Sequence, residues 1–235
     1  MKNQTENIDC INCQNLALSS LCALNHPELT RLNDYKITYT VKKNQVLFNE
    51  EEIAKGLFCL NKGKVKLIKT LSDGNTQILR ISKESELLGY RGLLGDGKYI
   101  ATAIALEDSL VCYIPKDKIF ELIGSNIKFA MNLMSLFAHD LSLAENKSVS
   151  FIQKNSRARL AETLLLLEKS FGKTPKNYIN ILLSREDIAN IAGMATETAV
   201  RVLHEWEQNN IIELDKKYIR IIANHQLFSL AELVD

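Results

Sequence analysis

The segment from Ser184 to Asn210 constrains the fold of this chain more than any other, because its residues fit two helices joined by a tight turn. Ser184 can cap the free amides at the start of a first helix, with Asp187 in the favourable first turn. Gly193 stands where the chain must turn with a positive φ, and Thr196 can cap a second helix. The segment therefore predicts a helix-turn-helix.

The predicted second helix has two chemically different faces. Its inward face is apolar at helical spacing and consists of Ala199, Val202, Leu203 and Trp206. The outward face carries Glu197, Val200 and Arg201, which can read base edges: arginine donates to guanine, glutamate accepts from cytosine, and an apolar group meets the thymine methyl. Glu197 and Arg201 also fit an ordinary i,i+4 surface pair. Their place near the start of the second helix favours base reading.

After Asn210, two short β-prone runs flank a polar turn, which predicts a hairpin, or wing, beside the helices. Its basic residues Lys216, Lys217 and Arg220 are candidates for phosphate contact, and a solvated turn is an equally good interpretation. This half of the chain predicts a regulator that binds double-stranded DNA. The other residues expected to contact DNA are Ser184, Arg185, Thr196, Thr198 and His204.

Charge and composition limit the partners. The net charge over 235 residues is only +1, so DNA binding requires a local basic stripe rather than a general affinity for polyanions. No apolar run is long enough to span a bilayer, and the polar N-terminus lacks the apolar core of a signal peptide. We therefore expect a cytoplasmic protein without a membrane partner. Five cysteines in that compartment are not expected to form structural disulfides, so metal and redox use are to be considered.

Three of the cysteines are close together near the N-terminus. Cys10 and Cys13 are separated by two residues, and Cys22 follows after eight more. This spacing is typical of zinc and iron-sulfur sites, although three thiolates do not complete one. Cys22 fits equally well as a buried residue on a helix, because free cysteine is among the most buried residue types.

From about residue 37 to residue 114 the chain consists of short β-prone runs separated by turn residues, of which Asp73-Gly74 is the clearest hairpin signal. Many short strands without intervening helices predict an antiparallel double-sheet β-roll, followed by helices in an α+β chain. Such a roll can hold a small ligand or be packed solid.

The pattern becomes helical from residue 116 to residue 153, where apolar residues recur at i, i+3 and i+4. So broad an apolar surface needs more than one partner, and we expect one side on the roll and the other on a second subunit. A purely intramolecular core helix is the alternative. The residues assigned to the dimer contact are Met131, Met134, Ala138, Leu141 and Ala144. The predicted parts of the chain are a cysteine-containing segment (1–30), the β-roll (31–115), the dimerisation helix (116–153) and a winged helix-turn-helix domain (154–235).

In this order the parts resemble the Crp/Fnr family of bacterial transcription regulators over nearly the whole chain. The motifs that carry the resemblance are GLFCLNKGKVKL, DGNTQILRI, ELLGYRGLL, TAIALEDSLVCYIP and LSREDIANIAGMATETAVRVLHEWEQNNII. The resemblance implies a homodimer on a two-fold symmetric DNA site, an effector at the roll or its N-terminus, and contact with RNA polymerase. The hairpin at Asp73-Gly74 is a candidate for the polymerase contact.

The resemblance also bears on specificity. The family's usual recognition pattern is glutamate, two residues, a small residue and arginine; Glu197 and Arg201 match it, whereas Val200 takes the small position. Val200 can meet a thymine methyl but cannot hydrogen-bond, so we expect a related half-site that differs at that base. The cyclic-nucleotide branch uses Gly-Glu and Arg-Ser pairs. Here Gly89 precedes Tyr90, and YIATA holds neither Arg nor Ser, so cyclic AMP is not expected to bind in the usual way.

The oxygen-sensing Fnr branch binds a 4Fe-4S cluster through three N-terminal cysteines and a fourth in the roll. The residues that resemble these four are Cys10, Cys13, Cys22 and Cys112. The gap between Cys13 and Cys22 is longer than in the best-known members. Ala144 stands where that branch has an acidic residue that opposes pairing, so this dimer is expected to persist without a cluster. Cys59 matches no ligand position and is expected in the core.

Three functions follow from these patterns. The leading hypothesis is a dimeric transcription regulator whose cysteines hold an oxygen- or redox-labile iron-sulfur cluster. The second keeps DNA binding but gives the roll a small organic ligand or none, with the cysteines as core residues or a thiol switch. The third is a cupin-like metal enzyme, which needs histidines in the roll strands. The histidines all lie elsewhere and are His26, His139, His204 and His225.

Overall fold

The computed structural model describes residues 8–72 and 74–231. These residues form two compact units. One comprises the described residues up to Lys69 together with Leu79–Ser142, and the other comprises Thr70–Ile78 with the described residues from Leu143 onward. The division falls inside the long helix, between Ser142 and Leu143. Asp73 of the candidate polymerase-contacting hairpin lies outside the described residues, as does the start of the cysteine-containing segment.

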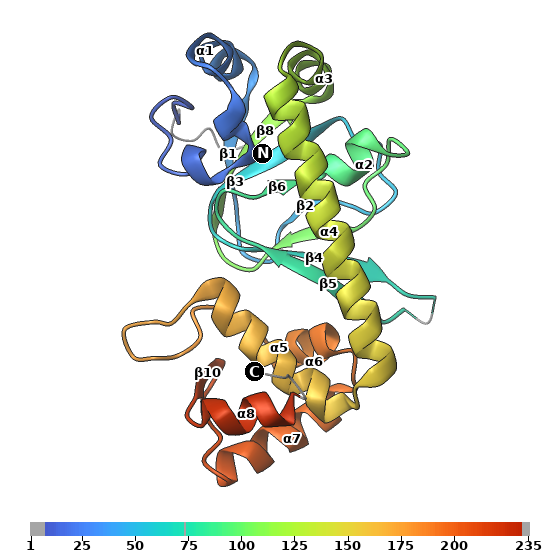
Figure 1. Ribbon diagram of the computed structural model, residues 1–235, viewed down its shortest axis with the longest axis vertical. Coiled ribbons are helices and arrows are strands. Elements are labelled where there is room, and N and C mark those ends of the chain that lie inside the picture. The colour runs from blue at the N-terminus through green and yellow to red at the C-terminus, as the bar shows by residue number, and fades with distance from the viewer. Residues whose placement is uncertain (1–7, 73, 232–235) are drawn as a thin grey trace. The chain divides into compact units, whose positions relative to one another are not determined.

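The β-roll consists of two four-stranded antiparallel sheets, as predicted (Figure 1). Their strand orders are β1-β8-β3-β6 and β2-β7-β4-β5. The strands are β1 (Ile37–Val41), β2 (Val46–Phe48), β3 (Gly56–Lys62), β4 (Val65–Thr70), β5 (Thr76–Ser82), β6 (Leu87–Leu88), β7 (Thr102–Ala105) and β8 (Ser109–Pro115). Only the short β6 and the helix after it were not predicted.

Short helical segments accompany the roll. They are η1 (Leu16–Leu18), η2 (Ser20–Ala23), α1 (His26–Tyr35), α2 (Tyr90–Leu94) and α3 (Lys116–Ser125). Helix α1 begins with a reciprocal cap, in which Asn25 accepts from the Glu28 amide and Glu28 accepts from the Asn25 amide. That cap fixes where the N-terminal segment ends.

The helical segment predicted from 116 to 153 is two helices, α3 and α4 (Ile127–Gln153). Asn126 between them has an extended backbone, and its side-chain oxygen accepts a hydrogen bond from the Phe129 amide at 3.0 Å. A short polar side chain of this kind competes with the helix for backbone donors, which explains the break. Within α4, Phe129 and Leu133 are buried against the roll.

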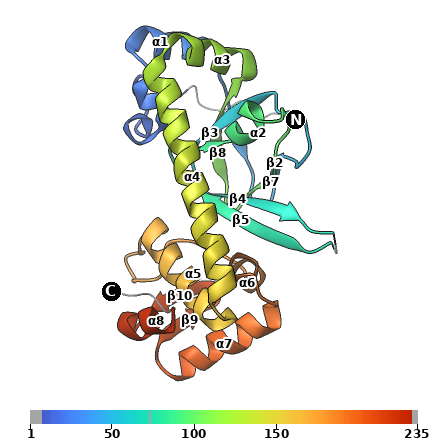
Figure 2. The same cartoon turned by 45° about the vertical axis from the view of Figure 1, so that its right-hand side comes forward.

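In the described part of the second unit from Leu143 onward, the two strands form one hairpin and the other regular elements are helices (Figure 2). Its elements after α4 are α5 (Ser156–Phe171), α6 (Arg185–Ala192), α7 (Thr196–Gln208), β9 (Ile212–Asp215), β10 (Tyr218–Ile221) and α8 (Asn224–Leu230). Helix α5 ends at Gly172, whose φ of 70° suits a residue without a Cβ. Among the described residues, none of the helices combines the length and apolarity that a membrane crossing requires.

Candidate DNA interface and thiol cluster

Helices α6 and α7 form the predicted helix-turn-helix. The Ser184 hydroxyl accepts from the Asp187 amide at 2.9 Å, and the Asp187 carboxylate accepts from the Ser184 amide at 3.0 Å. Gly193 has a φ of 62°, and a Cβ there would lie 2.1 Å from the Phe151 ring. The expected cap at Thr196 is wrong, because α7 already includes Thr196 and its N-cap is Ala195, without a side-chain hydrogen bond.

The two faces of α7 are sorted as the sequence indicates. The buried residues are Ala199, Val202, Leu203 and Trp206. Glu197, Arg201 and His204 are exposed, and Val200 is half-buried. Glu197 and Arg201 form no ion pair with each other among the described residues, so their side chains are not held together as an ordinary surface pair. The His204 ring lies 3.3 Å from the Glu207 carboxylate.

The wing forms at the predicted hairpin, with Tyr218 paired to Asp215 across the turn. Lys216 and Lys217 are exposed in the turn. Arg220 is paired with the Glu213 carboxylate on the neighbouring strand, so it is less available for phosphate than the two lysines.

Two arginine side chains stabilise the helix-turn-helix through hydrogen bonds to backbone carbonyls that the sequence did not predict. The Arg159 side chain on α5 donates to the carbonyls of Ala192 and Gly193, each at 2.9 Å, and so satisfies the backbone of the turn. Arg185 donates to the Lys216 carbonyl at 2.9 Å and ties the start of α6 to the wing. When an arginine donates to carbonyls that are distant in sequence, no periodicity or spacing along the chain reveals the hydrogen bond.

Two cysteines lie side by side on the roll. Cys59 of β3 and Cys112 of β8 are directly paired in the antiparallel register, and both are buried. Side chains at paired positions point to the same face of a sheet. The Ser19 hydroxyl oxygen is 4.0 Å from the Cys59 Sγ, and the Thr38 hydroxyl oxygen is 3.6 Å from the Cys112 Sγ. The segment before α1 therefore covers this face.

Cys10 and Cys13 of that segment lie over the same face. The Sγ of Cys10 accepts a hydrogen bond from the Lys36 ammonium at 3.2 Å, and the thiol is buried. The Sγ of Cys13 accepts from the Asn61 amide group at 3.4 Å. Asn61 follows Cys59 by two residues on β3, where the register against β8 shifts, so this contact places Cys13 beside the end of that strand.

The thiols of these four cysteines influence one another. Burial raises the pKa of Cys59 to about 12, and Cys112, Cys13 and Cys10 raise it as well. Burial also raises the pKa of Cys10, where the nearby Lys36 charge acts in the opposite direction. The four sulfur atoms are therefore close enough to interact electrostatically.

Cys22 lies apart from this group. It is exposed in η2, and its Sγ is 3.8 Å from the side-chain amide of Asn132 on α4. The same amide donates to the Ser20 carbonyl at 3.2 Å, which holds this turn beside α4. The structure thus brings Cys10, Cys13 and Cys112 together but not Cys22. The alternative of a buried Cys22 is also wrong.

Within residues 8–72 and 74–231, no three histidine, cysteine or acidic side chains converge closely enough to hold a single metal ion. Thiolates that bind different irons of one cluster lie farther apart than ligands around one ion. The four thiols at the roll offer thiolate sulfur, the ligand type that both zinc and iron-sulfur sites take.

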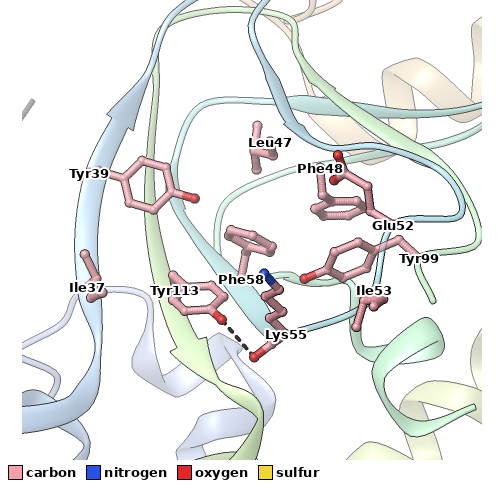
Figure 3. A pocket seen from close by; sticks show the side chains of 10 residues that line it. All are labelled: Ile37, Tyr39, Leu47, Phe48, Glu52, Ile53, Lys55, Phe58, Tyr99 and Tyr113. Atoms are coloured by element: carbon pink, nitrogen blue, oxygen red, sulfur yellow. Dashed lines mark hydrogen bonds between the residues drawn. The ribbon is translucent and has the colours of Figure 1, made fainter. Parts of the chain in front are cut away.

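A pocket of about 570 Å³ opens into the roll (Figure 3). Its aromatic wall includes Phe48 and Tyr99, which stack with centroids 4.1 Å apart. The hydroxyls of Tyr99 and Tyr113 donate to backbone carbonyls at 2.9 and 2.8 Å. Tyr39 points its hydroxyl toward the interior, where burial raises its pKa well above the ordinary value. It is therefore a neutral hydrogen-bond donor that faces the pocket.

Tyr90 follows Gly89, where the resemblance to the cyclic-nucleotide branch implies a glutamate. It is fully buried, and its hydroxyl donates to the Asp140 carboxylate on α4. The Arg80 guanidinium of β5 donates to both Asp140 oxygens, at 2.9 and 3.0 Å, and to the Tyr90 hydroxyl at 3.1 Å. This buried network, formed by Arg80, Tyr90 and Asp140, connects the roll to α4.

Residues 39–126 match the cyclic nucleotide-binding domain, and residues 158–229 match the Crp-like helix-turn-helix domain. The fumarate and nitrate reduction regulatory proteins of Vibrio cholerae and Escherichia coli are each 29% identical to the chain over 228 residues, which cover 94% of this chain and 90% of each relative. Electron transport regulator A of Shewanella oneidensis is 28% identical with the same coverage.

Solved structures have the same fold. FixK2 from Bradyrhizobium japonicum matches with a TM-score of 0.75 at 22% identity, covering 85% of this chain and 99% of that one. A CRP-family transcriptional regulator from Thermus thermophilus matches with a TM-score of 0.68 at 20% identity, covering 82% and 96%.

These domains define a DNA-binding transcription regulator with a roll of the cyclic-nucleotide-binding type. The chain belongs to the Crp/Fnr family, which confirms the resemblance found in the sequence. Because these relatives are regulators, the cupin-like enzyme hypothesis is wrong.

Proposed function

We propose that this regulator senses oxygen or redox state through a 4Fe-4S cluster bound where the N-terminal segment covers the β-roll. The observation that carries the proposal is the gathering of Cys10, Cys13 and Cys112, from two distant parts of the sequence, on one face of the roll. The name of the 29%-identical relatives, which regulate fumarate and nitrate reduction, supports a link to anaerobic metabolism.

The surroundings of the thiols act on iron binding in two opposing ways. Thiols must lose their protons to bind iron, and burial holds the protons on Cys10 and Cys112 while the site is free of iron. The cluster supplies the positive charge that stabilises the thiolates, and the Lys36 ammonium beside Cys10 offsets the remaining negative charge. In the N-terminal segment, Cys10 is buried and Cys13 is half-buried.

The first prediction concerns iron content. Full-length protein prepared without oxygen is expected to contain about four iron and four sulfide per chain, because the four ligand cysteines would hold one 4Fe-4S cluster per chain. Exposure to air is expected to remove both and to lower affinity for a palindromic family-type DNA site. Iron, sulfide and zinc analysis beside DNA binding tests this. Anaerobic protein without iron would contradict the proposal.

We also propose that the regulator is a homodimer paired through α4, as a two-fold symmetric DNA site requires. Within that helix, Met131, Met134 and Leu141 are 52%, 63% and 61% exposed. Ala138 and Ala144 are exposed beside them. An apolar stripe opposite the roll-facing side matches the surface that a second copy would cover.

Replacing Leu141 by glutamate is expected to raise the dimer dissociation constant by roughly a hundredfold or more, because two unpaired charges would meet at the seam. Sedimentation at several protein concentrations measures this. His139→Glu is the matched control, since His139 is exposed on the same helix but off the stripe. A dimer of unchanged affinity in L141E would place the contact elsewhere.

A small organic ligand in the roll is a second candidate, favoured by the aromatic pocket and the inward Tyr39 hydroxyl. We infer that such a ligand is not cyclic AMP, because Tyr90 fills the position of the phosphate-side glutamate and is bonded to Asp140. Regulation that persists after all of the cluster-binding cysteines are changed to serine would favour this second function.

A further inference from the structure

We propose that Cys59, and not Cys22, is the fourth thiolate of the cluster site, together with Cys10, Cys13 and Cys112. This inference rests on the proposed iron-sulfur function and changes its ligand set. Neither family resemblance nor cysteine spacing points to Cys59, which the sequence assigned to the core.

Cys59 lies beside Cys112 on the sheet. It is the register partner of Cys112, so the two side chains lie next to each other on one face. That face is the one that the N-terminal segment covers, because Ser19 contacts the Cys59 sulfur and Asn61, two residues further along β3, contacts Cys13. Cys59 is thus part of the sheet face over which the N-terminal thiols lie.

The N-terminal thiols lie over the face of the sheet that carries Cys59 and Cys112. Cys10 and Cys13 belong to one turn, in which the Cys13 amide donates to the Cys10 carbonyl at 3.4 Å. The side-chain oxygen of Asn33 accepts from the Cys10 amide at 2.7 Å and fixes this turn against α1. Two thiols from the turn and two from the sheet form a set of four, the number that a 4Fe-4S cluster requires.

Cys22 lies outside that set. Between Cys13 and Cys22 the chain passes through η1 and enters η2, where the Ser19 hydroxyl still contacts Cys59 and caps the Leu21 amide. Three residues after Ser19, the Cys22 thiol is exposed beside Asn132 of α4. To reach the cluster, η2 would have to release both Asn132 contacts and its Ser19 cap.

The experiment compares C59S with C22S in full-length protein, loaded with iron and sulfide without oxygen. Iron, acid-labile sulfide and the visible absorption of the cluster are measured in each. We expect C22S to keep wild-type iron, and C59S to lose at least three quarters of it. Wild-type iron in C59S, or loss of iron in C22S, would overturn the assignment. Wild-type protein without iron would instead overturn the proposed function itself.

A second measurement does not depend on a folded variant. The loaded wild-type protein is treated with iodoacetamide, and each cysteine is followed by mass spectrometry before and after the cluster is removed with a chelator. Cys22 is expected to react at the same rate in both states, within about twofold. Protection of Cys22 by the cluster, to the extent seen for Cys13, would show that Cys22 is a ligand and would sink the proposal.

Discussion

Replacing Asp140 by alanine is expected to lower the free energy of unfolding by about 3 kcal/mol, because it leaves the Arg80 guanidinium buried without its counter-charge. The Asp140 side chain is 8% exposed and that of Arg80 is 25% exposed, so water offers little compensation. The Tyr90 hydroxyl loses its acceptor as well. Chemical denaturation of the wild type and D140A, monitored by circular dichroism, measures the difference.

The matched control replaces both members of the ion pair. In R80M/D140L both charges of the pair are removed, and the apolar side chains occupy a similar volume, so we expect most of the lost stability to return. If D140A were as stable as the wild type, the network of Arg80, Tyr90 and Asp140 would not stabilise the packing of α4 on the roll. A double variant less stable than D140A would show that the pair contributes through its charges.

Replacing Arg201 by alanine is expected to weaken binding to the palindromic family-type site by roughly 10- to 100-fold, because a bidentate contact to guanine discriminates by about 1–3 kcal/mol. The side chain is exposed on α7 and has no ion-pair partner among the described residues, so its removal costs the fold little. Titration of labelled duplexes, with the guanine of each half-site intact or replaced, measures the loss.

Two variants separate base reading from general attraction. R201K keeps the positive charge but not the planar fork, so it is expected to lose specificity nearly as fully as R201A. K217A, in the exposed turn of the wing, is expected to weaken all duplexes about equally and to reduce the salt dependence. If R201A kept its preference for the intact guanine, Arg201 would not be the residue that reads it.

Much of this fold was accessible from local patterns. The cap at Ser184, the glycine at residue 193 and the apolar face of α7 depend on spacing along one helix or turn, and each was confirmed. The roll strands follow from β-prone runs broken by turn residues, and their existence was confirmed although their pairing was not predicted. The errors arose where a local interaction changed the end of a helix. Asn126 interrupts the predicted long helix, and α7 begins at Thr196, so the N-cap position falls on Ala195.

The sequence by itself determined the family, the helix-turn-helix and the exposed residues of its second helix, because these depend on residue types at short, regular spacings. Only the tertiary structure decided which thiols meet. Cys59 and Cys112 are 53 residues apart in the chain, yet strand register pairs them, whereas Cys22 is near Cys13 in sequence and is turned toward α4. Register and the path of a covering loop are set by contacts between distant segments, and spacing along the chain does not encode them.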